Sequence, residues 1–373
     1  MRRVVIINKS LPRYRVEFYN RLRNQLQSRD IELQLIYGNT HVDSRKDAAV
    51  IEWAVARENR VVKLGSVNLI WQPCLREVNA ADLVIVEQAN KLLLNYILIF
   101  RKLFGNKKFA FWGHGLNLQA SKVNPFNIFK RLYVNKPSWW FAYTNGVEKF
   151  LLKTGFDKNK ITVVQNAIDT GKLHEHYTGI TETEIQQLKA KLGIQENEHV
   201  CIYCGSLYKE KKLEFLIATV ETLRNNGYPV KLIIVGSGPM EGYVTAAAAE
   251  KSWLLYEGAK FGREKAMYFK IAHLFLHPGA IGLAILDSFA FETPMVTTTY
   301  DFHGPEFHYI ENDYNGLVTS EDPDDYVTAV AGLLDDPAQI EKLKSTFPLM
   351  RERYNIQAMV NNFSNGIEKA LGQ

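Results

Sequence analysis

Cysteine is scarce in this sequence, with only Cys74, Cys201 and Cys204 among 373 residues. So few cysteines exclude a scaffold held by several disulfides and suit a reducing compartment. Cys201 and Cys204 have the C-x-x-C spacing, but no second cysteine pair completes a zinc site, and no helix follows directly as in a thioredoxin motif. The apolar run around them therefore predicts a buried strand.

Long apolar runs are missing as well. The stretch 92–100 is interrupted by Asn95 and is about half a membrane span in length. The apolar residues after Met1 meet Lys9 too soon to form the core of a secretory signal. We therefore expect a cytoplasmic protein, either in solution or associated with the inner face of the membrane.

Strong charge of either sign is absent, because 45 basic and 40 acidic residues leave a net charge of +5. No motif for nucleic-acid binding accompanies this mild excess, so we expect no nucleic-acid partner. Aromatic and basic residues alternate in the stretches 100–104 and 126–133. Such stretches suit an anionic membrane surface, but a helix with an apolar core face and a solvated basic face also explains them, and we favour the helix.

The chain contains two successive series of short β-rich runs separated by helical stretches. Strands that alternate with helices pair in parallel and form doubly wound sheets, and the length of the chain favours two domains. We predict an α/β fold of two Rossmann-like domains, 1–170 and 171–354, facing a central cleft, with a last helix at about 355–373 packing back on the first. The predicted strands are 4–8, 32–37, 83–87, 109–112, 140–144, 161–165, 200–204, 231–235, 254–257, 274–277 and 295–299.

The turn Gly205-Ser-Leu-Tyr-Lys-Glu-Lys211 lies between a predicted strand and a helix. A glycine turn followed by a lysine is suited to hold a diphosphate, because backbone N–H groups and a cation meet the anion there. A solvated helix start explains the lysines equally well. The strands at 231–235 and 254–257 also end in turns, which contain Gly236, Gly258 and Lys260.

The run Pro278-Gly-Ala-Ile-Gly-Leu-Ala-Ile-Leu-Asp287 is the most informative part of the chain. A helix predicted to begin near Gly282 would direct its first amides at a phosphate group. Asp287, further along that helix, would accept hydrogen bonds from ribose hydroxyls. The alternative is that Asp287 is an ordinary exposed carboxylate.

The order of these blocks, followed by Thr293-Pro294 and Pro305-Glu306, resembles glycosyltransferase family 4 over nearly the whole chain. The family pattern is G-R-L-x-x-x-K, then E-x7-E enclosing F-G-L, then G-x-P and P-E. The resemblance implies a GT-B fold, a nucleotide-diphosphate sugar donor and transfer with retention of configuration. The variant Pro-Gly-x-Ile-Gly-Leu is similar to a branch that builds bacterial surface polysaccharides.

Three positions depart from the family pattern. Ser206 stands where the family usually has arginine, Gly279 where it has the first glutamate, and Asp287 where it has the second. Because the first glutamate commonly contacts the transferred sugar, its loss leaves the identity of the sugar open. Lys211 remains to neutralise the departing diphosphate.

The first half of the chain supplies the other candidate residues. The segment containing Pro12, Tyr14 and Arg15 resembles the first-loop P-x-Y-R pattern of family members that build such glycans, although solvated arginines are the plainer interpretation. His114 lies between two glycines after a predicted strand, and the resemblance implies a place near the donor sugar. Glu87 and Asn90 also follow a strand and suit sugar hydroxyls.

The resemblance implies a hexosyltransferase that needs no metal and no cofactor, with a uridine diphosphate sugar favoured as donor. The expected acceptor is a glycan or a lipid-linked saccharide, bound through Pro12, Tyr14, Arg15, Glu87 and Asn90. His114 and Lys211 are the predicted catalytic residues. The predicted donor-binding residues are Gly205, Ser206, Lys211, Gly236, Gly258, Lys260, Gly279, Ala280, Ile281, Gly282, Leu283 and Asp287.

Two other functions fit the same sequence. A nucleotide-sugar epimerase on this fold would release an altered sugar nucleotide without any acceptor. A non-catalytic nucleotide-sugar-binding subunit would explain why Ser206 and Gly279 replace charged residues.

Overall fold

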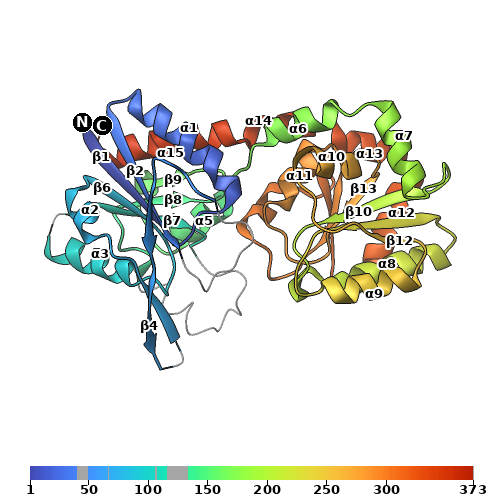
Figure 1. Ribbon diagram of the computed structural model, residues 1–373, viewed down its shortest axis with the longest axis horizontal. Helices are drawn as coiled ribbons and strands as arrows, with labels where there is room; N and C mark the ends of the chain where they lie inside the picture. Colours follow the sequence, from blue (N-terminus) through green and yellow to red (C-terminus); the bar gives the residue numbers. More distant parts are fainter. Residues whose placement is uncertain (40–48, 66, 106, 116–132, 373) are drawn as a thin grey trace. The chain divides into compact units, whose positions relative to one another are not determined.

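The computed structural model describes residues 1–39, 49–65, 67–105, 107–115 and 133–372. It divides into two compact units, one formed by Met1–Ile168 with Ile356–Gln373 and the other by Asp169–Asn355. Each unit is built around one parallel sheet (Figure 1). In the part of the chain that is described, no helix is both long and apolar enough to cross a membrane.

The first unit contains a seven-stranded sheet in the order β3-β2-β1-β6-β7-β8-β9. All neighbouring strands are parallel. The strands are Arg2–Asn8 (β1), Ile31–Asn39 (β2), Val55–Glu58 (β3), Leu83–Glu87 (β6), Phe109–Gly113 (β7), Trp139–Ala142 (β8) and Ile161–Val163 (β9). The helices are Val16–Gln27 (α1), Leu75–Ala80 (α2), Leu93–Phe104 (α3), Asn145–Lys153 (α5) and Ile356–Leu371 (α15), with short 3-10 turns at Arg13–Arg15 (η1) and Lys158–Lys160 (η2).

The last helix, α15, packs into the first unit although it is the end of the chain. Phe363 stacks on Phe141 of β8 with ring centroids 4.3 Å apart. A Cβ at Gly366 would lie 2.5 Å from the Thr162 Oγ1 of β9, so the helix backbone comes close to the sheet only because glycine is there. The aromatic stack and this close approach hold α15 on β8 and β9.

The second unit contains a six-stranded parallel sheet in the order β12-β11-β10-β13-β14-β15. Its strands are His199–Cys204 (β10), Val230–Val235 (β11), Leu254–Tyr256 (β12), Leu274–Leu276 (β13), Met295–Thr298 (β14) and Gly316–Thr319 (β15). Its helices are Thr170–Thr178 (α6), Glu182–Lys191 (α7), Leu213–Asn225 (α8), Glu241–Glu250 (α9), Gly262–Lys270 (α10), Ala284–Ala290 (α11), Pro323–Asp335 (α12), Pro337–Lys344 (α13) and Phe347–Arg353 (α14), with 3-10 turns at Lys209–Lys211 (η3) and Pro305–Tyr309 (η4).

Both sheets have a topological switch point, where the strand order reverses. In the first unit β1 lies between β2 and β6, and in the second β10 lies between β11 and β13. Ligands of doubly wound sheets bind beyond the carboxyl ends of the strands at such a point. In the second unit this places the turn after β10 beside the turn after β13, which are the two turns singled out in the sequence.

Every predicted strand is present, and four strands among the described residues were not predicted. These are β3, β15 and a hairpin of Arg60–Leu64 (β4) and Val67–Trp71 (β5). The hairpin carries exposed Val61 and Val62, so it lacks the buried apolar run that identifies a central parallel strand. Cys201 and Cys204 are buried and free in β10, which confirms the predicted core strand.

Candidate active site

The turns after β10 and β11 approach each other backbone to backbone. A Cβ at Gly236 would lie 1.9 Å from the Gly205 carbonyl oxygen, and one at Gly238 would lie 2.4 Å from that of Leu207. The Leu207 N–H donates to the Ser237 carbonyl over 3.0 Å, and the Gly236 N–H donates to that of Gly258 over 2.8 Å. Only glycine permits this approach, so the strand ends are fixed relative to one another.

Lys211 ends the 3-10 turn η3 and is nearly covered, with 7% of its surface exposed. Its ammonium donates a hydrogen bond to the Ala280 carbonyl, which belongs to the turn after β13. Burial lowers the pKa of Lys211 to about 8, with the nearby Glu210 charge acting in the opposite direction. No carboxylate of the described residues makes hydrogen-bonding contact with this buried cation, which is therefore well placed to receive an anionic ligand.

The surroundings of Gly279 leave no room for the glutamate that glycosyltransferase family 4 usually has at this position. A Cβ there would lie 2.3 Å from the Glu210 carbonyl oxygen and 2.4 Å from the Lys211 carbonyl carbon. The Ala280 N–H also donates to the Glu210 carbonyl over 2.8 Å. The backbone of η3 thus occupies the space that a side chain at 279 would need.

The amides of the turn after β13 fall into two groups. Those of Ala280 and Ile281 are used within the protein, by the Glu210 carbonyl and by His303 Nδ1 at 3.0 Å. Among the described residues, none accepts a hydrogen bond from the N–H groups of Gly282 and Leu283, which are half-buried. The amides of Gly282 and Leu283 are therefore available to a phosphate oxygen.

Helix α11 begins at Ala284, two residues later than predicted, and is seven residues long. Leu283 is the N-cap of α11. Its backbone angles are already helical, and its side chain makes no capping hydrogen bond. So short a helix adds little dipole beyond its own amides, because the dipole effect arises from the free groups of the first turn. The amides carry most of the anion-binding capacity here.

Asp287 is buried, so the alternative of an ordinary exposed carboxylate is wrong. Its Oδ1 lies 2.7 Å from the Lys265 ammonium of α10. Burial lowers the pKa of Lys265, but the charge of Asp287, the hydrogen bond to it and the charge of Cys204 together raise it above its usual value. Lys260 pairs with Glu264 at 2.7 Å after the turn at Gly258. The ion pair with Lys265 fixes the direction of the Asp287 carboxylate.

Sequence analysis missed three residues that shape this site. Lys265 orients Asp287, and His303 accepts from the Ile281 amide while its other ring nitrogen donates to the Thr298 carbonyl over 2.8 Å. Burial lowers the pKa of His303 to about 4, which keeps it neutral for both roles. Glu306 is buried beside Gly282, where a Cβ would lie 3.9 Å from its Oε2. Of these three residues, only Glu306 could have been found from the sequence, because it belongs to the Pro305-Glu306 pair that resembles the family pattern.

The lowered pKa of Lys211 predicts a pH-dependent affinity for a diphosphate. The charged ammonium is lost as the pH rises through about 8. Above that pH the association constant of uridine diphosphate should therefore decrease, and the decrease should approach tenfold for each pH unit. Isothermal titration calorimetry between pH 7 and 9.5 measures this. The Lys211→Arg variant is the matched control, because its guanidinium stays charged; a flat profile in the wild type contradicts the prediction.

In the first unit, Arg15 is buried and not solvated, so the plainer interpretation of this residue is wrong. Its guanidinium donates to the Asn166 side-chain oxygen and lies 4.8 Å from the ring centroid of Trp112. It also lies 5.7 Å from the ring of Tyr143, at the carboxyl end of β8. Aromatic faces attract a guanidinium, and they hold Arg15 at the carboxyl edge of the sheet.

His114 lies at the same edge, directly after β7. Its ring centroid is 4.5 Å from that of Tyr143, so Tyr143 lies between His114 and Arg15. His114 is exposed, and the neighbouring Gly115 has φ +73°, which favours glycine. The imidazole of His114 is therefore exposed at the carboxyl end of β7.

The remaining predicted acceptor residues are spread along this edge. Glu87 ends β6, and its Oε2 accepts from the Lys9 N–H over 3.2 Å. The Pro12 carbonyl accepts from the Arg15 N–H over 3.0 Å, and Tyr14 is exposed. Asn90 is held by two tyrosines. Its side-chain oxygen accepts a hydrogen bond from the Tyr133 hydroxyl, and its carbonyl accepts one from the Tyr96 hydroxyl of α3 over 2.8 Å. Most of the stretch 126–133 lies outside the described residues.

Part of the chain is similar in sequence to known glycosyltransferases. Residues 198–336 match the family model for glycosyl transferases group 1. The chain is 26% identical over 167 residues to an alpha-monoglucosyldiacylglycerol synthase of Acholeplasma laidlawii, covering 42% of this chain and 40% of that protein. It is 22% identical over 235 residues to an alpha-galactosylglucosyldiacylglycerol synthase of Streptococcus pneumoniae, covering 60% and 59%. The chain thus spans about half the length of the curated relatives it matches.

Solved structures match over the full length. A glycosyltransferase from Rickettsia africae has a TM-score of 0.71 at 14% identity, with 99% of this chain and 98% of that one covered. Anabaena Alr3699/HepE in complex with UDP-glucose also has a TM-score of 0.71, at 13% identity, with 99% and 100% covered. The predicted fold class is confirmed: the chain has the GT-B fold of two Rossmann-like domains, and its segment 198–336 matches the glycosyl transferases group 1 in sequence.

Proposed function

We propose that this chain is a glycosyltransferase that moves a sugar from a nucleotide-diphosphate donor to a glycan or lipid-linked acceptor. The observation that carries the proposal is the buried Lys211 ammonium, held on the turn that also offers the open Gly282 and Leu283 amides. A cation held against a turn, together with two N–H groups of that turn, matches the charge that develops on a leaving diphosphate. The donor then binds at the carboxyl edge of the second sheet.

The reaction proceeds without a metal ion in this proposal, because Lys211 and the backbone amides supply the electrostatic stabilisation. Placement in glycosyltransferase family 4, and retention of configuration, rest on the order of the sequence blocks. In a retaining transfer without a protein nucleophile, the acceptor attacks from the face that the diphosphate leaves, and the leaving phosphate takes the proton. Asp287, oriented by Lys265, accepts from the ribose hydroxyls.

Two similarities support narrower choices of substrate. Alr3699/HepE was solved with UDP-glucose bound, which supports a uridine diphosphate sugar as donor. The relatives from Acholeplasma laidlawii and Streptococcus pneumoniae are named as diacylglycerol glycolipid synthases, which supports an acceptor with a lipid part. A lipid-linked acceptor in surface polysaccharide synthesis, reached by a peripheral protein at the membrane, is consistent with both.

His114 is the proposed residue at the transferred sugar, and its replacement tests the role of the first unit. The His114→Ala variant should lower transfer about a hundredfold, within the range ascribed to proton transfer and polar stabilisation. Its affinity for uridine diphosphate should remain that of the wild type. His176→Ala is a matched control on a helix of the second unit. Unchanged transfer in the His114 variant contradicts this assignment.

Acceptor dependence separates the proposed function from its alternatives. A thermal-shift screen with uridine and guanosine diphosphate sugars first identifies the donor. Nucleotide release from that donor is then measured with and without a lipid-linked oligosaccharide fraction, and transfer predicts release above slow hydrolysis only with acceptor. An altered sugar nucleotide formed without acceptor indicates an epimerase, and binding without any turnover indicates a non-catalytic subunit.

A further inference from the structure

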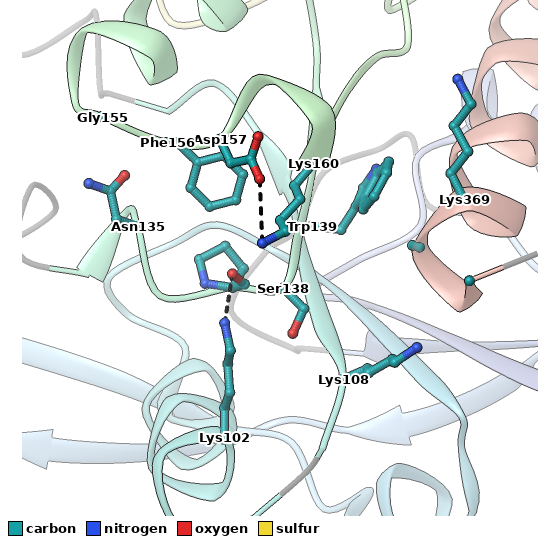
Figure 2. A pocket seen from close by; sticks show the side chains of 13 residues that line it. Lys102, Lys108, Asn135, Ser138, Trp139, Gly155, Phe156, Asp157, Lys160 and Lys369 are labelled. Atoms are coloured by element: carbon teal, nitrogen blue, oxygen red, sulfur yellow. Dashed lines mark hydrogen bonds and ion pairs between the residues drawn. The ribbon is translucent and has the colours of Figure 1, made fainter.

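A second basic site lies in the first unit, at the opposite edge of its sheet from His114. A cavity of about 540 Å³ opens at the amino ends of β7, β8 and β9, and four lysines line it (Figure 2). Lys108 precedes β7, Lys160 precedes β9, and Lys102 and Lys369 come from α3 and α15. Glu87 is the last residue of β6 and His114 directly follows β7, so the cavity is at the other edge of the sheet from these candidate site residues.

The charge in this cavity is poorly balanced. Among the described residues, its lining contains a single carboxylate, that of Asp157, which pairs with Lys160 at 3.4 Å. The Lys102 ammonium donates to the carbonyls of Lys136 and Pro137, over 2.8 and 3.0 Å. Carbonyl oxygens orient an ammonium group but do not neutralise it. Four lysines against one carboxylate leave an excess of three positive charges in the lining.

Neighbouring groups add to this positive potential. A second cavity of about 350 Å³ shares Lys108 and is lined also by Arg2 and Lys107, with Asp82 as its carboxylate. Asp82 pairs with Arg2 at 3.4 Å and its charge also acts on Lys107, so three cations face one carboxylate among the described residues of that lining. Burial lowers the pKa of Lys102, and the charges of Lys160 and Lys136 lower it further. A bound anion would relieve this repulsion.

The walls suit an anion that carries an organic part. Trp139 and Phe156 provide apolar surface, and Ser138 provides a hydroxyl, beside the lysines (Figure 2). Lysine is an effective point-charge ligand for phosphate.

We propose that the cavity at the amino ends of β7, β8 and β9 binds a phosphate-bearing anion. The phosphate belongs either to a soluble phosphorylated compound or to the headgroup of an anionic phospholipid, since α3 also exposes Phe100 and Phe104 beside Lys102.

The test uses the full chain and two probes, without any nucleotide sugar. One arm measures binding of glycerol 3-phosphate by calorimetry. The other measures sedimentation with vesicles of phosphatidylglycerol and phosphatidylcholine, against vesicles of phosphatidylcholine alone. The test variant is Lys160→Gln with Lys369→Gln, and the control is Lys63→Gln with Lys149→Gln, which removes the same charge from exposed positions of the same unit.

The test variant should lose about thirtyfold in affinity, because each basic residue near an anionic surface contributes about fivefold. The control variant should lose much less, and both proteins should keep the wild-type melting temperature. A selective loss in the first arm identifies a soluble ligand, and one in the vesicle arm identifies a lipid headgroup. Equal behaviour of the two variants in both arms, or no binding by the wild type in either, overturns the proposal. The proposed transfer reaction is unaffected by that result.

Discussion

Replacement of Lys211 by alanine is expected to lower sugar transfer by a factor of about 10² to 10³. This is the effect typical of removing one preorganised group from the charge that develops in a transition state. Lys211 is buried and its ammonium is held on the Ala280 carbonyl, so no other lysine of η3 can take its place without moving the backbone. The rate of acceptor-dependent nucleotide release measures the effect.

Lys209→Ala is the matched control for this prediction. Lys209 belongs to the same 3-10 turn but is exposed. It should retain transfer within about twofold of the wild type, because exposed charges contribute little. Equal losses of sugar transfer in the Lys209 and Lys211 variants would mean that η3 stabilises the diphosphate only through its net charge, and not through the position of Lys211.

Restoring the family glutamate at position 279 should destroy the site rather than improve it. In the Gly279→Glu variant the new Cβ would lie 2.3 Å from the Glu210 carbonyl oxygen, which no real Cβ contact allows. The backbone of η3 must then move, and Lys211 moves with it. We expect a loss of about 1–3 kcal/mol in the free energy of unfolding and a loss of nucleotide binding. Denaturant unfolding and calorimetry measure the two effects.

Gly332→Ala provides the control for a glycine substitution as such. No atom would lie within 4 Å of a Cβ at Gly332, which is in the interior of α12. Alanine there should stabilise the protein by about 0.5–1 kcal/mol, because it removes the entropic cost of glycine in a helix. A Gly279→Glu variant as stable as the wild type and able to bind nucleotide would refute the steric account.

The sequence was most informative about elements whose structure is determined by their own residues alone. Buried parallel strands need continuous apolar runs, so β1, β10 and their neighbours could be identified without a structure. The exposed hairpin β4–β5 has no such run, and in β15 only Gly316 is fully buried. These elements depend on pairing partners that the local sequence does not reveal.

The same distinction applies to the candidate site. Lys211 and the turn after β13 were identified from their order along the chain, and the structure brings them into contact. The roles of His303 and Lys265 depend on groups 22 residues away in the chain, the Ile281 amide and the Asp287 carboxylate. The steric role of Gly279 likewise depends on η3, about 70 residues earlier in the chain. The sequence alone therefore showed only that a glycine stands where the resembling family usually has a glutamate.

The most direct test of the proposed donor site is a calorimetric titration of uridine diphosphate into the full chain at pH 7. Our account predicts one binding site per chain in the wild-type protein and a large loss of affinity in the Lys211→Ala variant. The Lys209→Ala variant should bind as the wild type does. Absence of binding to the wild type, or equal binding to the wild type and the Lys211 variant, would contradict the account.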